Sequence, residues 1–308
     1  MKALIHIGLP KAGSSSLQEF LRLNGPALRN RGLRHAPLDP RFGSQFELAA
    51  MGRHLTGMGI EDTAARLVLG LTGPQDLAAY AERYRRFLAE GLATWPEPLF
   101  VASCEHIHPW LTRPAPIAAL HGFLQHRFEG ARYVLYLRPQ ADVLLSAYSE
   151  RIRRGERPNL QTHLDARLPR LNYSAQVVLW EGVVGADRLD VRLLTPDALT
   201  GGDLIADFCA LMGTTTDGLQ MPRRMNPALS REEIALRRWL NRWLPVRRAD
   251  GARNPWYQRA LRLALALAPK TRTPLTLTDA QRAAIDARVA PWNEALRLHR
   301  FPDRAALF

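Results

Sequence analysis

Short runs of apolar residues alternate with helical patterns along the first 220 residues, and this alternation limits the folds open to the chain. The apolar runs span residues 3–7, 33–36, 99–103, 133–137 and 189–194. Most are apolar at consecutive positions, a pattern typical of strands buried on both faces of a parallel sheet. Helical periodicity separates them at residues 15–23, 75–92, 141–154, 174–184 and 203–212. We therefore predict an α/β fold with a central parallel sheet of about five strands.

The strand patterns stop after residue 220, and three further helices follow. They are predicted at residues 230–244, 254–268 and 279–298. Ser230 with Glu233 forms a capping box, and Thr278 is suited to cap the last helix. We predict one domain, residues 1–308, made of an α/β core (1–220) and a basic helical C-terminal extension (221–308).

The chain is strongly basic, and its charge is unevenly distributed. The formal net charge is +13 over 308 residues, and nearly all of the positive charge is arginine. Residues 223–272 contain twelve arginines and one lysine against three acidic residues. A coding bias toward arginine and a role in handling anions both account for this excess. The basic extension is expected to cover a bound anion, to contact an acidic acceptor, or to make peripheral contact with a membrane.

Cysteine usage and apolar run lengths give an expectation for the compartment. Cys104 and Cys209 lie in apolar segments, which predicts buried thiols rather than a disulfide framework. No signal-peptide pattern is present, and the apolar stretch at 263–269 is too short to span a bilayer. We expect a cytoplasmic protein, with contact at the inner membrane face left open.

The segment that follows the first predicted strand has the features of an anion-binding loop. Residues 8–16 read Gly-Leu-Pro-Lys-Ala-Gly-Ser-Ser-Ser and lead directly into a helix. Backbone N–H groups and the helix dipole favour an anion at such a junction. It also holds one of only three lysines in the chain. The predicted anion-binding residues are Lys11, Ala12, Gly13, Ser14, Ser15 and Ser16.

The loop has the glycine spacing of a Walker A motif but lacks its lysine. Ser14 follows Gly13 where a kinase or ATPase has the lysine that contacts the β- and γ-phosphates. Neither run 99–103 nor run 133–137 ends in the aspartate of a Walker B motif. The loop therefore suits one phosphate-like group and its neighbour better than a triphosphate.

A second anion site is predicted after the fourth strand. Arg138 follows run 133–137, at the strand end where open α/β sheets bind ligands. Ser146 lies on the polar face of the next helix, eight residues later. An arginine and a hydroxyl so placed can share one phosphate.

These motifs together resemble the PAPS-dependent sulfotransferases, where PAPS is 3′-phosphoadenosine 5′-phosphosulfate. Residues 10–18 read Pro-Lys-Ala-Gly-Ser-Ser-Ser-Leu-Gln and resemble the family's 5′-phosphosulfate loop, with serines where the family usually has threonines. Arg138 with Ser146 resembles its 3′-phosphate site. Residues 173–194, 226–230 and 292–296 agree more loosely, and residues 38–98 and 245–275 match nothing in the family. The resemblance is closest to bacterial glycan-type members.

The resemblance implies a fold, a reaction and a set of roles. The fold would be a P-loop-like three-layer sandwich, and the enzyme a sulfotransferase that uses PAPS as co-substrate and needs no metal. The acceptor would be a hydroxyl on a carbohydrate or glycolipid. Lys11 would stabilise the leaving phosphate during in-line transfer.

A base is expected to take the acceptor's proton, and the third strand leads to several candidates. Run 99–103 is followed by Cys-Glu-His-Ile-His at residues 104–108. Glu105 is the first choice, His106 the second, and His108 remains open. If none of them serves, His54 is the next candidate. One cysteine and two histidines with no partner cluster elsewhere argue against zinc.

Two other functions remain open at this stage. One is a P-loop nucleotide kinase or NTPase. The other is a non-catalytic binder of anionic polymers, because Trp239, Trp243, Trp256 and Tyr257 interleave with the arginines of residues 223–272. The second reading leaves both anion motifs unexplained, so nucleic acid is not the expected partner.

Overall fold

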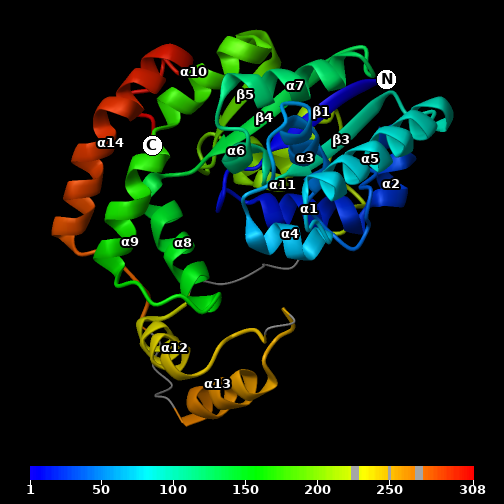
Figure 1. Ribbon diagram of the computed structural model, residues 1–308. Helices are drawn as coiled ribbons and strands as arrows, with labels where there is room; N and C mark the ends of the chain where they lie inside the picture. The colour runs from blue at the N-terminus through cyan, green and yellow to red at the C-terminus, as the bar shows by residue number, and fades with distance from the viewer. Residues whose placement is uncertain (223–228, 249–250, 268–272) are drawn as a thin grey trace. The chain divides into compact units, whose positions relative to one another are not determined.

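The computed structural model describes residues 1–222, 229–248, 251–267 and 273–308 (Figure 1). The chain divides into two compact units. The first contains Met1–Arg138, Tyr173–Met225 and Leu296–Phe308, and the second contains Pro139–Asn172 and Asn226–Ala295. Residues 139–172 thus group with C-terminal helices rather than with the α/β core. The predicted organisation as one domain, with a 221–308 extension, is not tested by this division.

The first unit is built on a five-stranded sheet in which all strands are parallel, as the sequence predicted. Its order is β2–β3–β1–β4–β5, so β1 is central and pairs with β3 and β4. The strands are β1 (Lys2–Ile7), β2 (Leu33–Arg34), β3 (Leu99–Cys104), β4 (Ala131–Leu137) and β5 (Leu189–Leu193). The predicted edge strand at 33–36 is reduced to two residues.

Helices cover both faces of this sheet and give the three layers that were predicted. α1 (Ser14–Leu23) and α11 (Leu204–Leu211) pack together in one layer. The other layer holds α3 (Phe46–His54), α5 (Pro74–Thr94), α7 (Pro114–Gln125) and α10 (Tyr173–Val184) (Figure 1). Five consecutive residues of β1 are buried, because the central strand is covered on both faces.

The described residues of the second unit form helices and two isolated β-bridges, Ser230 with Pro274 and Arg247 with Arg253, but no strand. The unit contains α8 (Gln140–Arg153), α9 (Leu160–Arg167), α12 (Arg231–Trp243), α13 (Pro255–Leu267) and most of α14 (Asp279–Arg300). The three helices predicted after residue 220 are therefore present. Both predicted N-caps form: Ser230 Oγ accepts from the Glu233 N–H at 3.2 Å, and Thr278 Oγ1 accepts from the Gln281 N–H at 3.2 Å.

The remaining elements are short connections that the sequence patterns did not reveal. They are α2 (Gly25–Arg29), α4 (Thr63–Leu69), α6 (Ile107–Trp110) and the 3-10 turns Leu168–Leu171, Ala186–Arg188 and Thr200–Gly202. Within the described ranges, no helix has the length and apolar character needed to cross a membrane.

Candidate active site

The carboxyl ends of β1, β3 and β4 lie side by side in the sheet, and the predicted site residues of the first unit follow these three ends. The 8–13 loop follows β1, Glu105 follows β3, and Arg138 follows β4. From β1 the chain continues toward β2, and from β4 toward β5, which is the opposite direction. Open α/β sheets bind ligands at such a switch point. The topology therefore brings together three segments that are far apart in sequence.

The junction between the 8–13 loop and α1 has backbone N–H groups with no backbone acceptor in the part of the chain that the structure describes. Gly13 is the N-cap residue, in the left-handed region at φ 86°. The N–H groups of Gly13, Ser14 and Ser15 donate to no carbonyl among the described residues. A Cβ on Gly13 would lie 2.2 Å from Leu204 Cδ2, a flexible side-chain end, so the positive φ is the stronger reason for glycine at this position. The junction fits an anion, which would accept from these donors.

Lys11 has an uncommon backbone conformation. Its φ is +68°, and it is the only described residue other than glycine with a positive φ. Such a conformation costs about 1–3 kcal/mol and recurs at ligand-binding sites. The Lys11 carbonyl accepts a hydrogen bond from Arg138 Nη1 at 3.2 Å, so the second predicted anion-binding side chain contacts the first predicted anion loop.

The other loop residues differ in how accessible they are to a ligand. Ala12 is fully buried, and its N–H already donates to the Leu9 carbonyl at 3.2 Å. Ser14 is buried, with Oγ 3.5 Å from the same carbonyl, whereas Ser15 is exposed and Ser16 is half-buried. Side-chain hydroxyls for an anion are therefore best supplied by Ser15 and Ser16.

The loop is packed directly against the segment that carries the predicted base. The Gly8 N–H donates to the Cys104 carbonyl at 3.1 Å. A Cβ on Gly8 would lie 2.4 Å from Glu105 Cα and 2.8 Å from Ser14 Oγ. Only a glycine allows this approach, because the Glu105 backbone cannot give way as a flexible side-chain end could. Glu105 itself is half-buried.

The structure also places the three histidines that were alternative candidates for the base. His106 stacks on Phe46, with ring centroids 4.2 Å apart, and its Nδ1 lies 3.3 Å from Ser44 Oγ. Burial lowers the pKa of His108, which hydrogen-bonds Gln176 of α10. His54 is the last residue of α3. Glu105, His106, His108 and His54 are all half-buried, so exposure does not rank these candidates, and the assignment of the base stays a prediction.

An aromatic cluster next to Glu105 comes from a segment that sequence reasoning did not place. Phe46 packs against Phe42 at 5.6 Å and Trp110 at 6.2 Å between ring centroids, and His106 lies between Phe46 and Trp110. Phe42, Phe46 and His106 are half-buried, so the cluster is partly accessible. The four-residue spacing of Phe42 and Phe46 was a signal, but residues 38–98 showed no motif to which it could be joined.

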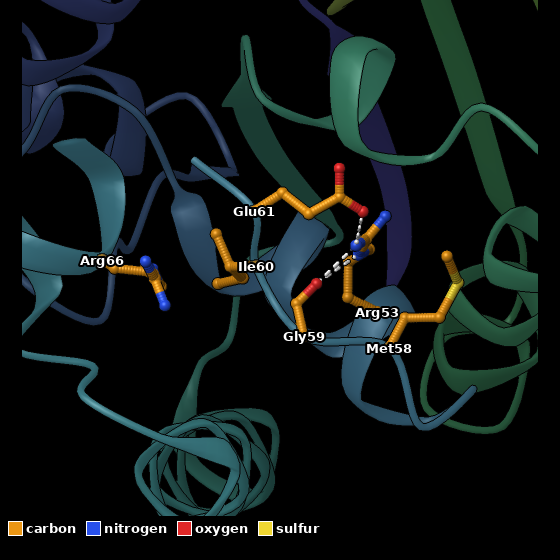
Figure 2. A pocket seen from close by; sticks show the side chains of 6 residues that line it. All are labelled: Arg53, Met58, Gly59, Ile60, Glu61 and Arg66. Carbon is orange, nitrogen blue, oxygen red and sulfur yellow. Dashed lines mark hydrogen bonds and ion pairs between the residues drawn. The ribbon is translucent and has the colours of Figure 1, made fainter. Parts of the chain in front are cut away.

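A hollow of about 460 Å³ lies at the end of α3 and the loop that leads to α4 (Figure 2). Arg53 donates to the Gly59 carbonyl at 2.8 Å and forms an ion pair with Glu61 at 3.0 Å (Figure 2). It also donates to the Trp110 carbonyl at 3.2 Å. Arg53 is therefore committed to holding this loop. No residue of the 8–16 segment lines the hollow, so it is not the predicted donor site.

The predicted partnership of Arg138 and Ser146 is not tested. Arg138 directly follows β4 in the first unit, and the Tyr173 hydroxyl donates to its carbonyl at 2.8 Å. Ser146 is half-buried on α8 in the second unit. Of the loosely similar segment 226–230, residues 226–228 lie outside the described part of the chain.

Both cysteines of the chain are buried in the structure. Burial raises the pKa of the Cys104 thiol to about 12 and that of Cys209 to about 11, and both thiols are buried as predicted. The described residues contain no group of three or more His, Cys, Asp or Glu side chains that could hold a metal ion.

Comparison with known proteins supports the fold. No protein-family model matches the chain, and no curated protein matches it in sequence. Among solved structures, it is similar to the crystal structure of a sulfotransferase from Alicyclobacillus acidocaldarius, with a TM-score of 0.51 and 14% identity. The match covers 96% of this chain and 94% of the other. The chain therefore has an α/β fold similar to that of this sulfotransferase.

Proposed function

We propose that this protein is a sulfotransferase that moves a sulfuryl group from PAPS to an acceptor hydroxyl. One observation carries the proposal: the loop of Lys11 packs against the segment of Glu105 and accepts a hydrogen bond from Arg138. The segments that carry Lys11, Glu105 and Arg138 are thus neighbours at the carboxyl ends of β1, β3 and β4. The fold match and the resemblance of residues 10–18 support the same reaction.

The proposed chemistry assigns a role to each of these groups. The acceptor oxygen attacks sulfur in line, the bond between sulfur and the bridging phosphate oxygen breaks, and the proton of the hydroxyl passes to Glu105. Negative charge then develops on the 5′-phosphate of the leaving nucleotide. Lys11 and the N–H groups at the start of α1 stabilise that charge, and Ser15 and Ser16 supply hydroxyl donors. Every step proceeds without a metal ion.

The phosphate at the far end of the donor is assigned to Arg138. A planar guanidinium can bind phosphate through two parallel N–H donors. Ser146 is proposed to share this phosphate. The resulting prediction is that 3′-phosphoadenosine 5′-phosphate binds far more tightly than AMP.

The acceptor is proposed to be a carbohydrate or glycolipid hydroxyl. The cluster of Phe42, Phe46, His106 and Trp110 supports this class, because it places ring faces beside the proposed base. The apolar C–H face of a sugar packs on such rings while its hydroxyls stay available to polar groups.

Calorimetry and a transfer assay test the proposal together. Wild-type protein is titrated with 3′-phosphoadenosine 5′-phosphate and with AMP, and Arg138→Ala with the same pair. Arg132→Ala is the matched control, since Arg132 lies on the same strand but is exposed and paired with Asp190 at 2.8 Å. We expect the wild type and Arg132→Ala to prefer the bisphosphate, and Arg138→Ala to lose most of that preference.

The transfer assay uses ³⁵S-labelled PAPS with a panel of glycans and glycolipids, in EDTA. Transfer is expected to persist in EDTA, and ATP is expected to support no turnover. Equal affinity for the two nucleotides, strict Mg²⁺ dependence, or acceptor-stimulated ATP hydrolysis would overturn the proposal in favour of a P-loop kinase or NTPase.

A further inference from the structure

The exposed tryptophans of this protein gather on one helical pair. The chain has seven tryptophans, and the three that are exposed all lie on α12 and α13. Trp239, Trp243 and Trp256 are 61%, 65% and 66% exposed. Large aromatic side chains are normally among the most buried in a folded chain, so such a concentration indicates a surface that meets a partner.

α13 carries two apolar faces, and only one of them packs against other residues that the structure describes. Tyr257 and Leu261 are buried and form a core cluster with Leu240 of α12. Leu263 and Leu267 follow Trp256 by seven and eleven residues, which is close to two and three full helical turns. The three side chains therefore form a separate stripe along α13. Leu263 and Leu267 are 67% and 87% exposed. This outer stripe is not needed to hold the helical pair together.

α12 repeats the arrangement. Leu236, Leu240 and Leu244 face the shared cluster with α13, whereas Trp239 and Trp243 are one turn apart and exposed. Each helix therefore uses one face for the internal core and presents a second, aromatic face outward.

Arginines accompany the exposed tryptophans. The guanidinium of Arg242 lies 5.3 Å from the ring centroid of Trp243, and that of Arg259 lies 5.2 Å from the ring centroid of Trp256. The described residues from 229 to 267 hold nine arginines against two glutamates. Glu233 is committed to Arg237 at 2.7 Å, and no described acidic side chain forms an ion pair with Arg242, Arg259 or Arg262. The charge of this surface suits an anionic partner.

We propose that α12 and α13 form a docking surface for the headgroup region of an anionic lipid bilayer. The tryptophans and the two exposed leucines would enter the interface, and the arginines would contact lipid phosphates. A tryptophan with a neighbouring arginine has the amphipathic character that membrane interfaces favour. This inference does not depend on the proposed transfer reaction.

The exposed aliphatic side chains favour a bilayer over a nucleic acid. Nucleic-acid strands use aromatic rings and cations, both of which are present here. They offer no apolar medium for Leu263 and Leu267, whereas the acyl boundary of a bilayer does.

Vesicle flotation tests the proposal with the full-length protein. Vesicles of phosphatidylcholine alone are compared with vesicles that contain about one third phosphatidylglycerol, at low and high salt. Binding is expected only to the anionic vesicles and should weaken with salt. Brominated lipids should also quench the tryptophan emission of the bound wild-type protein.

Two sets of substitutions assign the binding to this surface. Replacing Trp239, Trp243 and Trp256 together with alanine should lower vesicle partitioning by at least about tenfold, from the apolar area withdrawn. Replacing Arg242, Arg259 and Arg262 with glutamine should lower it by roughly fivefold per arginine. The matched controls, Leu67→Ala with Val68→Ala and a glutamine triple at Arg29, Arg86 and Arg113, replace exposed residues of the first unit and should bind as the wild type does.

Several results would contradict the proposal of a membrane-docking surface. Equal binding to neutral and anionic vesicles, absence of quenching by brominated lipid, or unchanged binding in both variant triples would each contradict it. Tighter binding of a 30-mer oligothymidylate than of anionic vesicles, lost in the tryptophan triple, would assign the surface to single-stranded nucleic acid instead. Circular dichroism confirms that the variants are folded, and the quenching result on wild-type protein needs no variant.

Discussion

Helices α1 and α13 are both amphipathic by sequence, yet their apolar side chains have different environments. On α1, Leu17, Phe20 and Leu21 are fully buried in the three-layer unit. On α13, two apolar residues are buried in the helical unit, and a second apolar stripe of Trp256, Leu263 and Leu267 is exposed. Each helix on the sheet, such as α1, packs its one apolar face against the sheet. In contrast, α13 has two apolar faces, and the described residues of its own unit cover only one of them.

This difference indicates a division of labour that substitutions can test. The first unit holds the groups proposed for chemistry at the ends of β1, β3 and β4. The second unit carries the surface proposed for the membrane. Changes in the first unit should therefore affect turnover or folding, and changes on the outer face of α13 should affect neither.

The largest effect is expected from removing the proposed base. Glu105→Gln keeps the shape of the side chain but cannot accept the proton of the acceptor. It should lower kcat by about 10²–10⁴-fold and leave donor binding nearly unchanged. Turnover with ³⁵S-labelled PAPS and calorimetry with 3′-phosphoadenosine 5′-phosphate measure the two quantities.

His106→Ala is the matched variant for this prediction. His106 is held by Phe46 and Ser44, so its removal should change KM more than kcat if it positions the acceptor. A near-wild-type Glu105→Gln together with an inactive His106→Ala would assign the base to His106. If both variants keep full turnover, the base lies elsewhere, and His54→Ala becomes the next variant to measure.

The next effect is expected at Lys11. Lys11→Ala removes a cation that is proposed to stabilise charge developing on the leaving phosphate. The loss should be about 10²–10³-fold in kcat, as for other single donors aimed at a transition state. Lys2→Ala is the control, because Lys2 is exposed at the start of β1, at the opposite end of the strand. Equal losses in the two variants would show that the effect is one of overall charge.

The comparison of α1 with α13 can be tested directly by stability. Phe20→Ala empties a fully buried position and should destabilise the protein by about 3–5 kcal/mol. Leu263→Ala removes an exposed side chain and should change the free energy of unfolding by less than about 0.5 kcal/mol. Urea unfolding followed by circular dichroism measures both. A large loss at Leu263 would mean that the outer stripe belongs to the folding core.

The sheet could be predicted from sequence because its signal is local and continuous. Runs such as 133–137 are apolar at every position, a pattern typical of a strand buried on both faces. The loop of Lys11 could also be predicted to bind an anion, because a glycine- and serine-rich turn between a strand and a helix presents free backbone N–H groups. The neighbourhood of Lys11, Glu105 and Arg138 followed from strand order, which the sequence alone did not supply.

Residues 38–98 could not be interpreted because their contacts are made across long sequence separations. Phe46 stacks on His106, and Arg53 donates a hydrogen bond to the Trp110 carbonyl. Gln45 bonds the backbone of Ser103 in β3. None of these contacts produces a local sequence pattern. The sequence of residues 38–98 therefore predicted neither the aromatic cluster nor the buried carboxyl of Glu47.

Glu47 gives the last prediction, which concerns pH and belongs wholly to the first unit. The side chain is buried on α3, and burial raises its pKa from 4.5 to about 7. Between these two values the folded protein keeps a proton that the unfolded chain has released. The contribution of Glu47 to stability is therefore fully present below about pH 4.5 and is lost as pH rises through 7. The corresponding loss is about 3 kcal/mol.

Glu47→Gln should remove this slope, because the amide stays neutral and its oxygen can still accept from the Leu38 N–H, as Glu47 does at 2.9 Å. The free energy of unfolding, measured in urea at a series of pH values from 4.5 to 8, should then fall less with pH in the variant than in the wild type. Glu90→Gln is the control, since Glu90 is exposed on α5, and its curve should parallel that of the wild type. Histidines buried in the folded state, such as His6 with a pKa lowered to about 3, act in the opposite direction below pH 6.5, and they do so in all three proteins. Subtracting the free energy of unfolding of Glu47→Gln from that of the wild type cancels this histidine contribution, which the two proteins share. A difference that stays constant across the pH range would contradict the prediction, because it would mean that Glu47 is already ionised in the folded protein.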